Sequence, residues 1–304
     1  MTTSVPISRS VPALRPLGVG DVIDRAITIY RRRPLLFIAL AAVPSLALGI
    51  GSALLGLAIT RALAPVGPLL TPGATDPAAL TRVATAISGI AAFLVIFVVM
   101  AVVVGAVQSG ALVDAAAARY LARQSTIGSS FRAGLRASLR LIGSGLLGVL
   151  AVLVLWTLLI IAMAVIQNGA AIALLAIFGV VATFFLLASW LIAPAVATLE
   201  GTGPLSTLRR SWHLSSGHRW RVLGLLFLLL VLQVILGVLL STVLLATVVA
   251  DPTVRTVLQQ VANLAVSILW APIQWATFTV LYYDLRVRKE AFDLQLAAEA
   301  LPRP

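Results

Sequence analysis

The chain has 304 residues, of which 61% are hydrophobic and only 11% are charged. A soluble domain of this size carries about 25% charged and about 45–50% apolar residues, so this composition excludes an ordinary soluble fold. The net charge of +12 is also typical of nucleic-acid-binding proteins, and the positions of the basic residues decide that question below. Cysteine is absent, which excludes disulfides, thiolate catalysis and cysteine-based metal sites.

The N-terminal part divides into a tail, a basic segment and an apolar run. Residues 1–16 are polar and contain proline, and we expect them to be disordered. Residues 18–33 place apolar side chains on one helical face and end in three arginines, which predicts an amphipathic helix in the membrane interface. The apolar run at 34–60 is longer than the apolar core of a signal peptide, which has about 7–15 residues, so we interpret it as the first membrane span.

Long runs without charge define the remaining spans. A bilayer core needs about 20 apolar residues per helix, and the run from 141 to 199 is long enough for two. Gln167, Asn168 and Gly169 lie near its middle and predict a tight turn. The sequence therefore predicts an all-α bundle of six spans in one domain (17–284), followed by a tail (285–304). The predicted spans are 34–60, 83–113, 141–166, 170–199, 222–250 and 256–283.

Two further basic segments precede spans and resemble the first. In 125–140, Ile127, Phe131, Leu135 and Leu139 form an apolar row. The third segment begins at Pro204, which favours the first turn of a helix. Both predict amphipathic interfacial helices that contact anionic headgroups. The candidate headgroup ligands in these two segments are Arg132, Arg136, Arg140, Arg209 and Arg210.

The distribution of basic residues predicts the orientation. Nineteen of the 22 Lys and Arg residues lie in the N-terminal segment, in 114–140, in 200–221 and in the tail, whereas three lie in the alternate connections. Basic residues in short loops mark the cytoplasmic side, so both termini are expected in the cytoplasm. This bias accounts for the net charge, and we expect no nucleic-acid partner.

Reporter fusions check this topology. Fusions at Arg123, Ser216 and Arg303 are expected to report the cytoplasm, and fusions at Gly73, Asn168 and Pro252 the external side. An external signal at Ser216 would contradict the six-span arrangement.

An acidic residue closes every second span: Asp114, Glu200 and Asp284. A carboxylate is disfavoured at a helix C-terminus by about 0.3–1 kcal/mol, so each acid needs a compensating cation. We interpret the three as structural clamps paired with nearby arginines, the candidates being Arg119, Arg209 and Arg286. The order of basic helix, two spans and acid also predicts a threefold internal repeat. The alternative is that any in–out topology with basic inner loops looks partly periodic.

The sixth span carries a polar stripe at helical spacing, formed by Gln260, Asn263, Ser267, Trp270 and Gln274. Amides facing lipid are costly, so the stripe is expected to face the bundle interior. Two roles are open for it: contacts between helices, or the lining of a polar cavity.

Side chains for catalysis are few. His213 and His218 are five residues apart, with no cluster of carboxylates near them, and a metal hydrolase needs several ligands and an open position. No serine has an evident base beside it, and the apolar runs contain no ionisable residue for proton coupling. We predict no enzyme activity, no cofactor, no metal and no catalytic residue.

Three stretches carry a family resemblance: RPLGVGDVIDRA at 15–26, RSWHLSSGHRW at 210–220 and YYDLRVRKEAFDL at 282–294. Together they resemble the glycerophosphoryl diester phosphodiesterase membrane domain, a family widespread in bacteria, and this implies the bacterial cytoplasmic membrane. The enzyme barrel fused to some members needs on the order of 250 further residues, so we expect none of its catalytic residues here. The resemblance implies no established biochemical role for members without the barrel.

These observations favour a non-catalytic integral membrane protein that acts as a scaffold, anchor or assembly partner. The alternative is a transporter for a lipid or another amphiphile. The expected partners are membrane lipids with anionic headgroups and either another membrane protein or a second copy of the chain.

Overall fold

The computed structural model describes residues 16–63, 77–166, 168–245 and 252–299, and every regular element in these ranges is a helix. The helices are α1 (Val19–Arg32), α2 (Pro34–Leu63), α3 (Pro77–Tyr120), α4 (Ile127–Val165), α5 (Gly169–Trp190), α6 (Ala193–Leu199), α7 (Pro204–Ser215), α8 (Arg219–Leu245), α9 (Pro252–Glu290) and α10 (Phe292–Glu299). Six stretches within these ranges are long and apolar enough to cross a membrane. The prediction of an all-α, six-span membrane protein is confirmed, whereas the threefold repeat stays a prediction. Of the residues 1–16 that were predicted to be disordered, 1–15 lie outside the described ranges.

Local signals explain where several helices begin and end. Asn168 caps α5, because its Oδ1 accepts hydrogen bonds from the backbone N–H groups of Ala170 and Ala171 at 2.9 and 3.2 Å. The predicted turn between the third and fourth spans therefore lies where expected, with Gln167 outside the described residues. Pro194 lies in the first turn of α6, so the fourth span is divided into α5 and α6. A proline in the first turn is tolerated because its missing N–H would be unpaired there.

The second basic segment differs from its prediction. It is the first part of α4, which runs without interruption from Ile127 to Val165, and it is not a separate interfacial helix. Thr126 caps this helix by accepting the Ser129 N–H at 3.2 Å. The predicted apolar row is largely uncovered, with Leu135 60% and Leu139 80% exposed. The face that α4 buries instead contains small residues: Ser130, Gly134, Ala137 and Ser144, together with Leu141.

Spin labels can check the environment of this segment. Phe131 is half-buried and packs against the core, whereas Arg132 is exposed. A label at Phe131 is therefore expected to be protected from a water-soluble relaxation agent, and a label at Arg132 to be accessible. Equal accessibility at the two positions would contradict an amphipathic start of α4.

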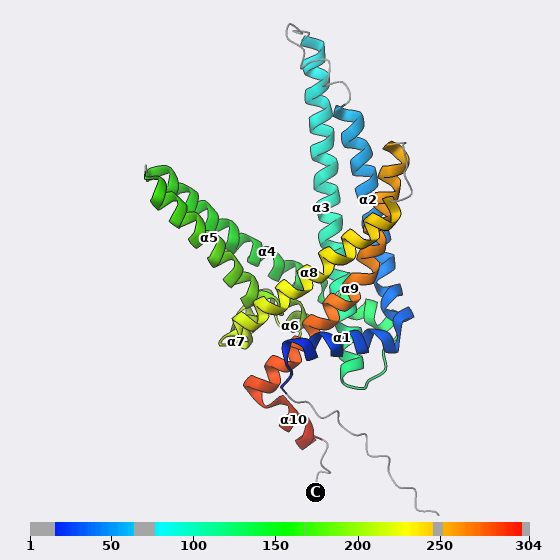
Figure 1. Cartoon of the computed structure of the whole chain (residues 1–304), viewed down its shortest axis with the longest axis vertical. Helices are drawn as coiled ribbons and strands as arrows, with labels where there is room; N and C mark the ends of the chain where they lie inside the picture. Colours follow the sequence, from blue (N-terminus) through cyan, green and yellow to red (C-terminus); the bar gives the residue numbers. More distant parts are fainter. Residues whose placement is uncertain (1–15, 64–76, 167, 246–251, 300–304) are drawn as a thin grey trace, which may run out of the picture.

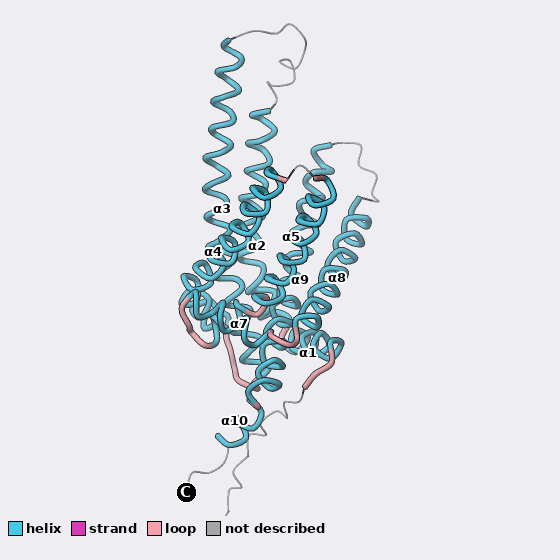
Figure 2. The backbone as a smooth tube through the Cα atoms, turned by 90° about the vertical axis from the view of Figure 1, so that its left-hand side faces the viewer, coloured by secondary structure: helices cyan, strands magenta, loops and turns pink. Residues whose placement is uncertain are grey.

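The helices are joined at one end and diverge toward the other (Figure 1). The main core lies at the joined end, where buried residues of α1, α3, α6 and α8 pack on the C-terminal half of α9. From there the α4–α5 hairpin leans away from α2 and α3, and Figure 2 shows the same bundle turned by 90°. In the most apolar 18-residue window of α3, of α4 and of the α5–α6 stretch only 6% of residues are buried, against 39% in α2 and 44% in α9. The buried residues of α2 and α9 lie mostly in their halves near the joined end, and the outer parts of α2, α3, α4 and α5 contain few buried residues.

Among the glycines of the described residues, the tightest approach of two backbones is between α3 and α4. A Cβ on Gly134 would lie 2.3 Å from the carbonyl oxygen of Val107 and 2.8 Å from the backbone nitrogen of Ala111. On the other helix, a Cβ on Gly110 would lie 2.9 Å from the Gly134 Cα. Only glycine permits the two backbones to approach this closely.

Candidate functional site

The most deeply buried charge among the described residues is that of Asp284, near the end of α9. Its side chain is fully covered, and its Oδ2 forms ion pairs with Arg221 Nη1 at 2.9 Å and Arg288 Nε at 3.1 Å. The backbone N–H of Leu17 donates to its Oδ1 at 2.7 Å. Arg288 Nη2 donates to the Leu17 carbonyl at 2.9 Å, and Arg221 Nη2 donates to the same oxygen. This Asp284 cluster (Leu17, Arg221, Asp284 and Arg288) holds the N-terminal segment and the start of α8 against α9.

A second cluster surrounds Glu200, just after α6. Arg210 Nε donates to both Glu200 carboxylate oxygens, at 3.0 and 3.1 Å, and the Tyr282 hydroxyl donates to Oε1 at 2.9 Å. Arg210 Nη2 also donates to Glu290 Oε2 at 2.9 Å, and Arg286 Nε donates to that oxygen at 3.0 Å. This Glu200 cluster (Glu200, Arg210, Tyr282, Arg286 and Glu290) ties α6 and α7 to the end of α9.

Arg210 is the central cation of the Glu200 cluster. Burial lowers its pKa, but the hydrogen bonds and charges of Glu290 and Glu200 outweigh burial, so the pKa of Arg210 lies above its usual range. The guanidinium therefore stays charged, and the carboxylate oxygens of Glu200 and Glu290 accept its hydrogen bonds. Such an arrangement resembles a fixed clamp, because the groups that could carry a proton are held by cations.

Asp114 is held differently from the other two acids. The Ser130 hydroxyl of α4 donates to its Oδ2 at 2.9 Å, and within the described chain Asp114 forms no ion pair. It thus joins α3 to α4 by a hydrogen bond beside the close crossing at Gly134.

The structure brings Glu200 and Asp284, but not Asp114, together with arginines, and the three arginine candidates named from the sequence were wrong. Asp284 pairs with Arg221 and Arg288, and Glu200 pairs with Arg210. Arg286 binds Glu290 instead. The other two candidates contact no acid in the described chain: Arg119 has a buried Nε and Nη2 without a hydrogen-bond partner, and Arg209 is exposed.

The five candidate headgroup arginines fall into two groups. Arg132, Arg136 and Arg209 are exposed, as a headgroup ligand must be, and Arg140 is half-buried. Arg210 is committed to Glu200 and Glu290, which corrects its assignment as a headgroup ligand. Binding of headgroups by the other four stays a prediction.

The polar stripe of α9 does not face the interior along its whole length. Gln260, Asn263 and Ser267 are exposed, Gln274 is half-buried, and only Trp270 is buried. The Ser267 hydroxyl nevertheless lies 3.2 Å from that of Ser45 in α2. Gln259, outside the predicted stripe, donates to Asn263 Oδ1 at 3.4 Å.

A small polar cluster between spans was missed from the sequence. Gln108 of α3 donates from Nε2 to Ser45 Oγ at 3.3 Å and to the Ala41 carbonyl at 3.2 Å, and Ser45 also meets Ser267. These contacts link α2, α3 and α9 inside the bundle. The amide of Gln108 in an otherwise apolar run was the signal that could have identified it.

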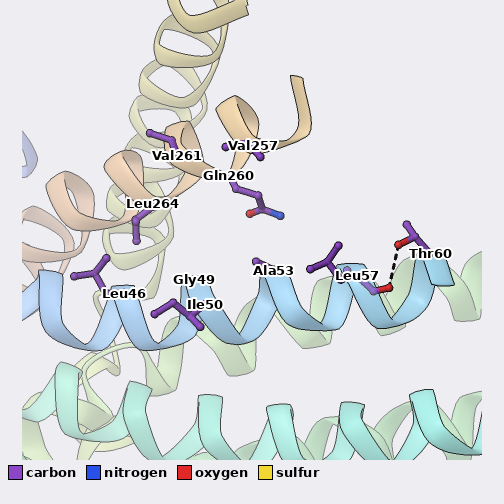
Figure 3. A pocket seen from close by; sticks show the side chains of 11 residues that line it. Leu46, Gly49, Ile50, Ala53, Leu57, Thr60, Val257, Gln260, Val261 and Leu264 are labelled. Carbon is purple, nitrogen blue, oxygen red and sulfur yellow. Dashed lines mark hydrogen bonds between the residues drawn. The ribbon is translucent and has the colours of Figure 1, made fainter. Parts of the chain in front are cut away.

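A groove of about 600 Å³ lies between the outer halves of α2 and α9 (Figure 3). Its walls are mostly aliphatic, and Gly49, Ala53 and Gly56 make room on the α2 side. Figure 3 shows the Gln260 amide pointing from α9 toward α2, and this amide has no hydrogen-bond partner in the described chain. Thr60, by contrast, satisfies its hydroxyl by donating to the Leu57 carbonyl at 3.0 Å. An apolar groove with one free amide fits an amphiphile better than an ion.

Within the described residues, no three His, Asp or Glu side chains lie close enough together to hold a metal ion. The expectations of no metal, no cofactor and no enzyme activity stay predictions.

Comparison with known proteins gives one match. Residues 17–285 match the model of a protein family described as "Domain of unknown function (DUF7847)". No curated protein and no solved structure matches the chain. The resemblance to the glycerophosphoryl diester phosphodiesterase membrane domain stays a prediction, because this match does not test it.

Proposed function

The chain belongs to the DUF7847 family, whose description assigns no activity, and we propose from its geometry that it is a non-catalytic membrane scaffold. In this proposal the α4–α5 hairpin takes up a transmembrane helix of another integral membrane protein. The observation that carries the proposal is how little of these spans the chain itself covers. Only 6% of the residues are buried in the most apolar window of α3, of α4 and of the α5–α6 stretch. Helices in a membrane associate by close packing and not by escape from water, so spans that the chain leaves bare are free to pack with other helices.

The clamped end supports the same role. The Asp284 and Glu200 clusters fix α8 and α9 to the N-terminal segment and to α7, so the bare hairpin stands on a rigid base. Pre-organisation of this kind lowers the entropic cost of binding a partner. We further propose that this base lies at the cytoplasmic face of the cell membrane, with both termini inside, as the distribution of basic residues indicates.

Photo-cross-linking in native membranes tests the scaffold. A cross-linking amino acid is placed at each position from Leu150 to Ile161 of α4, one at a time. A seated partner helix is expected to give adducts of one protein at a period of about 3.6 residues, because only one face of α4 meets it. The matched control is a scan of the same length on α2, from Leu36 to Ala47, where six of the twelve positions are buried, against one in the α4 scan. Lipid adducts alone at every α4 position would overturn the proposal.

The second candidate function is a transporter or carrier for a lipid or amphiphile, and the groove at Gln260 favours it. An alkyl chain fits between α2 and α9, and the free amide is placed to hold a polar head.

Proteoliposomes distinguish the two functions. A carrier is expected to move a fluorescent amphiphile between leaflets faster than in protein-free liposomes, and Gln260→Leu is expected to abolish the gain. The control is Gln259→Leu, whose side chain lies outside the groove. If the wild-type protein does not speed up the movement of the amphiphile between leaflets, the carrier function is contradicted and the scaffold remains the proposed function.

A further inference from the structure

A second cavity, of about 440 Å³, lies where α7 packs against α4 and the end of α5. Its walls are Leu147 and Ala151 of α4, Trp190 of α5, and Leu208 and Trp212 of α7. This volume is within the range of about 300–1,000 Å³ found for small-molecule sites. We call it the interfacial pocket.

The pocket is held open by a rigid wall. Trp212 lies edge-on to Phe185, with ring centroids 5.4 Å apart, and 6.4 Å from Trp190. The Arg219 guanidinium stacks on both Phe185 and Trp212, at 4.2 and 4.5 Å from the ring centroids. The side of α7 away from the pocket is fastened as well, because Ser211 donates to the Ser189 carbonyl at 2.8 Å. Collapse of the cavity would require these contacts to break.

Two adjacent arginines of α7 have opposite surroundings. Arg210 is held by two carboxylates, whereas Arg209 lines the pocket, is exposed, and makes no hydrogen bond or ion pair in the described chain. Leu205, one turn earlier on the pocket side, is 53% exposed. The pocket therefore offers an apolar interior, aromatic walls and one unpaired cation.

Three tryptophans near the pocket indicate that it lies at the depth of lipid headgroups. Tryptophan is enriched at membrane interfaces, and Trp190, Trp212 and the 87% exposed Trp220 gather around the joint of α5, α7 and α8. Basic pockets between spans at the cytoplasmic face are known sites for anionic lipid headgroups. A zwitterionic lipid would bring its own cation to the Arg209 guanidinium, whereas an anionic lipid such as phosphatidylglycerol brings a net negative charge and no cation.

We propose that the interfacial pocket binds an anionic phospholipid, with one acyl chain between α4 and α7 and the phosphate on Arg209. The guanidinium presents paired N–H donors that match two phosphate oxygens. The site does not depend on the scaffold proposal, because it uses only residues of this chain and of the lipid.

Native mass spectrometry of the full chain in detergent tests the site. Phosphatidylglycerol and phosphatidylcholine with the same acyl chains are titrated against the wild-type protein and three variants. The wild-type protein is expected to retain one phosphatidylglycerol in preference to phosphatidylcholine. Arg209→Gln is expected to weaken phosphatidylglycerol binding about tenfold or more, because a charge-assisted hydrogen bond is lost. Ala151→Phe keeps the charge but fills the pocket, and is expected to weaken both lipids.

The matched control is Arg123→Gln, which removes an exposed arginine of the connection between α3 and α4, outside the pocket, and is expected to bind as the wild type does. Equal binding by Arg209→Gln and Arg123→Gln would overturn the proposal. So would competition by inorganic phosphate at the concentration at which phosphatidylglycerol binds, since that result assigns a free anion to Arg209. Arg209 is exposed and unpaired, so its substitution is compatible with folding and the outcome is interpretable even where Ala151→Phe is unstable.

Discussion

Asp284→Asn is expected to lower the stability of the detergent-solubilised protein more than any other single charge removal in the described chain. The substitution leaves Arg221 and Arg288 facing a neutral amide at a site with no solvent exposure. Breaking a buried ion pair from one side costs about 3–5 kcal/mol, because the remaining charge has no partner. The loss is measured as a lower midpoint of thermal unfolding.

The control is Asp293→Asn in the first turn of α10, where a carboxylate gains only about 0.3–1 kcal/mol from the helix dipole. A second substitution, Arg221→Gln, is expected to restore part of the stability lost in Asp284→Asn, because it removes one of the uncompensated cations. If Asp284→Asn leaves the unfolding midpoint unchanged and abolishes a pH-dependent flux in liposomes, Asp284 is a proton carrier and not a clamp.

Gly134→Ala is expected to separate α3 from α4. The new Cβ would meet backbone atoms of Val107 and Ala111 at 2.3 and 2.8 Å, and backbone cannot move aside as a side chain can. Overpacking at such a contact costs about 1–3 kcal/mol. The hydrogen bond between Ser130 and Asp114, one turn away, is expected to weaken with it.

Gly128→Ala, in the first turn of the same helix, is the matched control because a Cβ there meets nothing within 4 Å. Alanine favours a helix over glycine by about 0.5–1 kcal/mol, so Gly128→Ala is expected to leave the melting temperature unchanged or raise it. A loss of stability as large as that of Gly134→Ala would show that the crossing of α3 and α4 is not where the two backbones touch.

The six spans were predictable because their signal is composition, which does not depend on how the helices meet. The pairing of acids near the ends of spans with arginines was predicted correctly for Glu200 and Asp284, but Asp114 takes the Ser130 hydroxyl instead. The arginine partner of each acid was only partly predictable from the sequence. Residues two apart on a helix do not face each other, so Arg286 was a poor candidate for Asp284, and the spacing of four favours Arg288.

Contacts between distant parts of the chain could not be predicted from composition or from spacing within one helix. Arg221 and the Leu17 backbone reach Asp284 only after α8 and the N-terminal segment pack on α9. Ser52 and Gly56 have the spacing of four that is typical of close helix contacts, yet a Cβ on Gly56 would meet nothing within 4 Å. The true close approach at Gly134 depends on which two helices cross, and spacing within one helix does not contain that information.

The central claim is that the diverging spans of this protein hold another membrane protein. Extraction of the protein from native membrane with an amphipathic polymer, without detergent, tests it most directly. The account predicts a particle that contains the chain and one other integral membrane protein in a fixed ratio. That protein should be the one cross-linked from α4, and it should be lost when a cross-linked position of α4 is changed to a bulky tryptophan. A particle that contains only this chain and lipid, whatever the α4 variant, would contradict the account.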